Sequence, residues 1–173
     1  MWASVEAVRI IGADFHETVN CDDRPPGCDG VVNDGWTVID GAVLLRNWYR
    51  SYFGERSRFS ELMDYEIAVN GRGIPDMDLV ETGEALVARL LRRGVAFAWE
   101  ALHEQYRQLP DVRMTAYISA APTLVDPDHY TGNVTFCAVR PAWPPYVDPK
   151  RLTDEIVIAL FTEDCEKPLP GSG

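Results

Sequence analysis

The longest regular pattern in the sequence is a run of apolar residues at helical spacing between Leu79 and Leu109. Asp78 and Glu81 form a capping-box-like start, and Pro110 stops the pattern. The periodic positions on the way are Leu86, Leu90, Leu91, Val95, Ala98, Leu102 and Tyr106. Gly94 either ends a first helix or lies inside a longer one, so the pattern predicts two abutting helices or one long helix over residues 79–109.

Segments typical of strands lie on both sides of this helical region. After it, residues 112–119, 134–139 and 156–162 carry alternating or β-branched apolar residues. Before it, residues 5–11 and 36–39 are also strand-like, while 65–69 fit a strand or part of a helix that begins at Ser60. Asp40 is suited to cap a helix that starts at Gly41 and carries an aromatic stripe to Phe53.

The order of these segments predicts the α+β class. We expect a mostly antiparallel sheet of about five or six strands, with two or three helices packed on one face. We also expect a single domain over residues 1–164 and a flexible C-terminal tail over 165–173, because this last stretch is rich in proline and glycine.

Charge and composition exclude several classes of protein. Asp and Glu number 27 against 16 Lys and Arg, for a formal net charge of −11, and 46% of residues are hydrophobic. This apolar fraction argues against intrinsic disorder, and the acidic balance argues against direct nucleic-acid binding. No run is long enough to span a membrane. We therefore expect a cytoplasmic protein, and the excess of arginine over lysine points to a GC-rich, bacterial genome.

The cysteines give no framework for a cofactor. Six residues separate Cys21 from Cys28, no second pair follows, and the acidic loop lacks the ligand spacing of a calcium loop. We predict neither a metal nor a cofactor. A Cys21–Cys28 disulfide stays possible only in an oxidising compartment, and the cytoplasmic expectation argues against it.

Acidic residues are densest between positions 14 and 40, where seven of them stand against Arg24 alone. Clustered carboxylates can imitate phosphate groups and speed association with a basic protein. Our main hypothesis is a protein-binding module, for instance an inhibitor or immunity-type protein that neutralises a basic, nucleic-acid-handling partner. The residues predicted to bind the partner are Asp22, Asp23, Asp29 and Asp34, with Trp36 and Tyr130 as aromatic anchors.

Two other hypotheses compete with this one. In a small enzyme or ligand-binding protein with an apolar aromatic pocket, His16 would act as acid or base with Asp14 or Glu17. His129, in an Asp-Pro-Asp-His loop, is a further catalytic candidate. In a homodimeric structural subunit, the helical face over residues 79–109 would form the interface.

Overall fold

The computed structural model describes residues 1–171, which form seven strands, six α-helices and four short 3-10 turns. The strands are β1 (Trp2–Ala3), β2 (Trp36–Ile39), β3 (Ala42–Leu45), β4 (Gly71–Gly73), β5 (Met114–Pro122), β6 (Tyr130–Ala138) and β7 (Ile156–Phe161). The helices are α1 (Val5–Ile11), α2 (Phe15–Thr18), α3 (Cys28–Asp34), α4 (Arg46–Arg50), α5 (Leu62–Asn70) and α6 (Gly83–Gln108). The 3-10 turns are η1 (Cys21–Asp23), η2 (Arg56–Arg58), η3 (Pro149–Arg151) and η4 (Thr162–Cys165).

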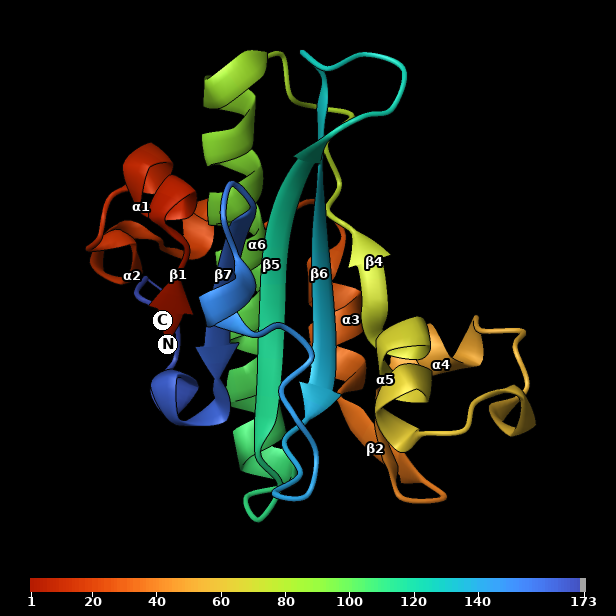
Figure 1. Cartoon of the computed structure of the whole chain (residues 1–173). Helices are drawn as coiled ribbons and strands as arrows, with labels where there is room; N and C mark the ends of the chain where they lie inside the picture. The colour runs from red at the N-terminus through yellow and green to blue at the C-terminus, as the bar shows by residue number, and fades with distance from the viewer. Residues whose placement is uncertain (172–173) are drawn as a thin grey trace.

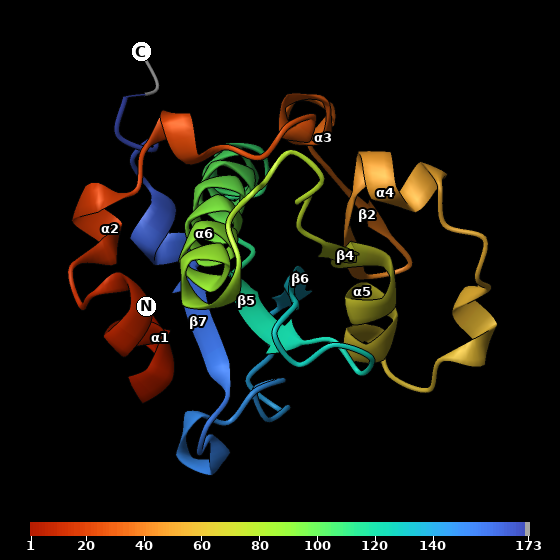
Figure 2. The same ribbon diagram turned by 90° about the horizontal axis from the view of Figure 1, so that it is seen from above.

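Five of the strands form one antiparallel sheet in the order β1-β7-β5-β6-β4, and β2 pairs with β3 in a separate hairpin. Helix α6 lies along one face of the sheet, and α1 and α3 pack against it (Figure 1). The view from above places the segment between β6 and β7 on the opposite face (Figure 2). The predicted α+β class is therefore confirmed. No helix within residues 1–171 has the length and apolar character needed to cross a membrane.

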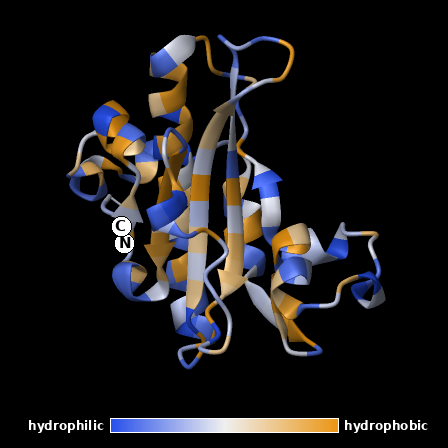
Figure 3. Ribbon diagram, viewed as in Figure 1, coloured by the Kyte–Doolittle hydropathy of each residue, from blue (hydrophilic) through white to orange (hydrophobic). Residues whose placement is uncertain are grey.

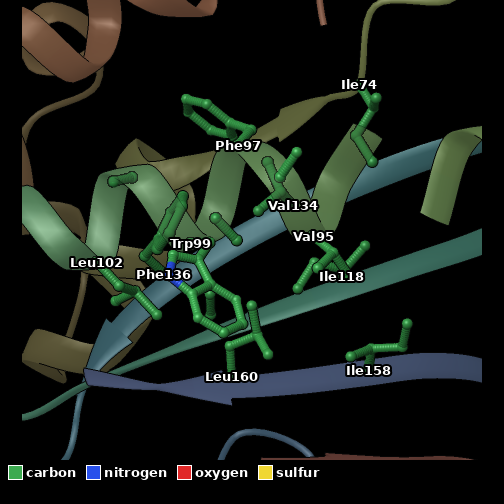
Figure 4. Packing of buried hydrophobic residues seen from close by; sticks show 14 of the residues in the cluster. Ile74, Val95, Phe97, Trp99, Leu102, Ile118, Val134, Phe136, Ile158 and Leu160 are labelled. Carbon is green, nitrogen blue, oxygen red and sulfur yellow. The ribbon is translucent and has the colours of Figure 1, made fainter. Parts of the chain in front are cut away.

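The main core lies between α6 and the sheet. Alternate residues of β5, β6 and β7 point toward the helix, as Ile118, Phe136 and Leu160 do (Figure 4). Helix α6 is continuous, which decides between one helix and two. Gly94 brings it close to the sheet: a Cβ at this position would lie 2.4 Å from Cγ2 of Ile118. The glycine that looked like a possible helix end is a point of close packing.

Three N-terminal segments differ from the predicted secondary structure. Residues 5–11 form a helix because Ser4 caps it, its side chain accepting a hydrogen bond from the Ala7 N–H. Asp40 and Gly41 have φ values of 48° and 83°, so they make the turn of the β2–β3 hairpin and do not begin a helix. Residues 62–70 form helix α5, so the helix is found here and the strand considered at 65–69 is not.

Helix α5 joins the hairpin to the main sheet through two fully buried polar side chains. The Glu66 carboxylate accepts hydrogen bonds from the Val43 N–H on β3 at 2.8 Å and from the Ala138 N–H on β6 at 3.0 Å. Asn70, one turn later, donates to the carbonyls of Val43 and Phe136. These side chains satisfy backbone groups at the end of β6 where β4 no longer pairs with it.

The segment that begins at residue 165, expected to be a flexible tail, packs against the rest of the protein. Cys165 and Leu169 are buried, and the Trp99 indole N–H donates to the Lys167 carbonyl at 2.9 Å. Residues 172 and 173 of the predicted tail lie outside the described part of the chain.

Candidate protein-binding interface

Asp23, one of the four predicted partner-binding acids, is an internal ion-pair residue. Its side chain is 5% exposed and lies 2.7 Å from an Arg92 nitrogen and 3.2 Å from an Arg89 nitrogen. Both arginines come from α6, more than sixty residues along the chain. Asp23 therefore ties the N-terminal segment to α6, and the prediction that it contacts a partner does not fit its position.

Arginines also stand beside two of the other predicted acids. Arg24 lies 3.3 Å from Asp29 and 3.5 Å from Glu100, and Arg50 lies 3.4 Å from Asp34. Cys28, Asp29 and Glu100 bring metal-type ligand atoms within 4.8 Å of one another, and the Arg24 guanidinium lies within ion-pair distance of both carboxylates. Three of the seven acids in residues 14–40 are thus paired with arginines. The other four, Asp14, Glu17, Asp22 and Asp40, are exposed and have no arginine or lysine within ion-pair distance among residues 1–171.

The two predicted aromatic anchors belong to the core or its margin. Trp36 is 2% exposed, its ring packs edge-on against Phe136, and its indole N–H donates to the Ala101 carbonyl at 2.8 Å. Trp36 is therefore a core residue, and its expected role as an exposed anchor is wrong. Tyr130, at the start of β6, is half-buried and packs against the main core.

The predicted catalytic residues do not form a catalytic arrangement. His16 lies on α2 with its Nε2 3.9 Å from the Glu17 carboxylate, and its Nδ1 is buried without a hydrogen-bond partner among residues 1–171. Asp14 is exposed, and no hydrogen bond within that range holds it to the ring. His129 is exposed in the β5–β6 loop. Neither histidine borders the two cavities described below.

A cavity of about 350 Å³ lies on the sheet face away from α6, beneath the proline-rich segment after β6. Tyr117 and Cys137 form part of its floor, and Trp143 and Tyr146 reach over it from that segment. Burial raises the pKa of Tyr117 to about 12 and that of Cys137 to about 12. Both groups are therefore protonated at neutral pH, so the cavity presents no activated nucleophile.

An exposed acidic and apolar surface lies at the end of the molecule where α6 begins. It consists of the loop before α6 (residues 75–82) and the β5–β6 loop (residues 123–129), and we call it the α6-end surface (Figure 1). Its large apolar side chains are almost completely exposed: Met77 97%, Val80 91%, Leu124 106% and Val125 96%. Figure 3 shows hydrophobic stretches in both loops. Large apolar side chains that stay exposed in this way are typical of interaction sites.

The α6-end surface also has a one-sided charge. Residues 73–88 and 114–139 contain no lysine or arginine, while the two loops and the first turn of α6 carry Asp76, Asp78, Glu81, Glu84, Asp126 and Asp128. Distant arginines pair with Asp78 and Glu84 alone among these six within the described residues. The sequence feature that indicates this surface is the absence of basic residues from residues 73–88 and 114–139. A search for the densest acidic stretch does not find it.

Comparison with protein-family models, with curated proteins and with solved structures gives no match for this chain. The geometry of its own surfaces and cavities is therefore the basis for assigning a function.

Proposed function

We propose that this chain is an intracellular protein-binding module that docks onto a basic protein partner, in the manner of an inhibitor or immunity-type protein. The α6-end surface carries this proposal, because it combines four exposed apolar side chains with acidic residues, most of which have no arginine or lysine within ion-pair distance among residues 1–171. Four cysteines that are all free fit a reducing compartment.

The two kinds of residue on this surface would have different roles in binding. Burying Leu124 and Val125 in a partner stabilises a complex by about 1.5–3 kcal/mol for each side chain. The carboxylates of Asp76 and Asp128 would mainly accelerate association with a positively charged surface, and salt would weaken that effect. The predicted acidic segment at 14–40 contributes less to this proposal, because Asp23, Asp29 and Asp34 lie in ion pairs and Trp36 is buried.

Site-specific photocrosslinking provides a test with an internal control. Val125 and Val5 are both exposed valines, at 96% and 80%, but Val5 lies at the start of α1, outside the two loops of the α6-end surface. With p-benzoylphenylalanine at position 125, we expect a specific crosslink to a positively charged protein in an extract of the native host, and none from position 5. A crosslink of equal yield from both positions, or none from position 125, would contradict the proposal.

Binding kinetics with the purified partner then test the charge. The double variant Asp76→Asn, Asp128→Asn should slow association about tenfold at low salt, and raised salt should remove most of the difference from the unmodified protein. Asp22→Asn is the matched control, because it removes an exposed acid from the segment first predicted to bind. An effect of Asp22→Asn as large as that of the double variant would return the interface to residues 14–40.

A further inference from the structure

A second cavity, of about 250 Å³, lies between α3, α4, β4 and α6. Its walls are apolar: Phe97 comes from α6, Val134 from β6 and Ile74 from the segment after β4, as Figure 4 shows. Trp48 of α4 closes another side. The cavity meets the α6-end surface at Pro75 and shares no lining residue with the cavity beneath the proline-rich segment.

Arg72 is the only charged residue among those that line this cavity. It lies opposite Val134 across the β4–β6 pair, and its guanidinium lies 5.5 Å from the centre of the Trp48 ring. Within residues 1–171 the Arg72 side chain makes a single hydrogen bond, in which Nη1 donates to the Gly71 carbonyl at 2.7 Å. The remaining N–H groups of the guanidinium therefore have donor capacity beside an apolar space.

The contrast with the other arginines makes this position unusual. Eleven of the fourteen arginines in the chain lie within ion-pair distance of a carboxylate, counted over the described residues. Arg46 and Arg56 also have no such partner there and, like Arg72, each donates to a backbone carbonyl, but neither of them lines this cavity. In a chain with 27 acidic residues, a half-buried arginine without a carboxylate indicates that a carboxylate from outside can occupy the site.

We propose that this cavity binds a small apolar carboxylate, with its carboxylate on the Arg72 guanidinium and its apolar body between Phe97, Trp48 and Val134. A planar guanidinium binds a carboxylate through paired hydrogen bonds, which gives the site its charge and orientation preference. Burial raises the pKa of the Cys28 thiol at the cavity wall to about 11, so this group is neutral and does not repel the anion.

The size of the cavity sets the class of ligand. A cavity of about 150 Å³ is known to hold benzene, so 250 Å³ accommodates a single aromatic ring with a short acidic arm. 3-Phenylpropionate is a probe of this size. For about ten non-hydrogen atoms we expect a Kd of about 1 mM or lower.

Titration of the full chain with 3-phenylpropionate, followed by amide and indole NMR signals and by calorimetry, tests the proposal. The signals of Gly73, Ile74 and the Trp48 indole should shift. The neutral 3-phenylpropionamide has the same shape but lacks the charge, and it should bind about 10- to 100-fold more weakly. This comparison uses the unmodified protein, so it does not depend on how any variant folds.

Variants then identify the cation. Arg72→Gln should weaken 3-phenylpropionate binding to the level of the amide, and Arg72→Lys should restore part of the affinity. Arg151→Gln, which removes an equally charged but exposed side chain, should leave binding unchanged. Equal affinity for acid and amide, or full affinity in Arg72→Gln, would overturn the proposal. So would the absence of binding by 3-phenylpropionate, indole-3-acetate and octanoate at about 10 mM.

Discussion

Replacing Glu66 by glutamine is the most direct test of how the two sheets are held together. Each carboxylate oxygen of Glu66 accepts one backbone N–H and one Arg140 N–H: Oε1 from Val43 and Nη2, Oε2 from Ala138 and Nη1. The four distances run from 2.6 to 3.0 Å, and the side chain is fully buried. Glu66→Gln keeps the shape but turns one oxygen into a donor, so one backbone N–H and one arginine N–H lose their acceptor.

The expected cost follows from this geometry. Breaking a buried ion pair by removing one partner typically costs about 3–5 kcal/mol. The Arg140 side chain is 20% exposed and can recover some hydration, which places the loss near the lower end, at about 3 kcal/mol. With a denaturant slope of about 2 kcal/mol per molar urea, the unfolding midpoint should fall by about 1.5 M.

Urea unfolding followed by tryptophan fluorescence measures this change. Glu55→Gln is the matched control, because it makes the same chemical change at an exposed pair with Arg58 and should alter stability by less than about 1 kcal/mol. If Glu66→Gln lowered stability no more than Glu55→Gln, the Glu66 carboxylate would not be what joins the hairpin to the sheet.

Three further predictions follow from other contacts. A hydrogen bond from Arg93 lowers the pKa of Asp78 to about 2, so the stabilising effect of this pair should be present above pH 4 and lost as the pH falls toward 2. Acid titration should therefore reduce the stability difference between the unmodified protein and Asp78→Asn. A difference that does not change with pH would show that the pair contributes nothing. Cys21 is half-exposed whereas the other three cysteines are buried, so a thiol reagent should modify one cysteine rapidly in the native protein and all four after denaturation; rapid modification of a second thiol would contradict the packing. Gly94→Ala should lower the unfolding free energy by about 1 kcal/mol or more, because overpacking against Ile118 exceeds the gain in helix propensity, and a rise in the melting temperature would show that the contact relaxes freely.

The sequence predicted the C-terminal half of the fold better than the N-terminal half. Strands expected at 112–119, 134–139 and 156–162 are found at 114–122, 130–138 and 156–161, since apolar alternation reports directly on a half-buried strand. Asp40-Gly41 was interpreted as a helix start, although the same dipeptide is a strong hairpin signal. The choice between the two depended on whether Ala42 to Leu45 would pair with Trp36 to Ile39, which is a tertiary property.

The candidate site was harder to predict for a related reason. A sequence shows where acids are dense but not which bases will lie beside them after folding. Asp23 looked like a surface acid because Arg89 and Arg92 are far away in the chain, and Trp36 was predicted as an anchor because it lies in the acidic stretch 14–40. The sequence could not show that Arg72 has no carboxylate partner either, because this depends on which side chains lie near it after folding.

The bridge formed by Glu66 also determines how the protein opens. The Val43 and Ala138 amides belong to different sheets and lie far apart in sequence, yet both are bonded to the same carboxylate. When α5 moves away, both amides lose their acceptor together, so their hydrogen-exchange rates are coupled in a single opening event. We therefore expect the Val43 amide of the β2–β3 hairpin to exchange together with the Ala138 amide at the end of β6, even though no backbone hydrogen bond of the hairpin reaches that strand within the described chain.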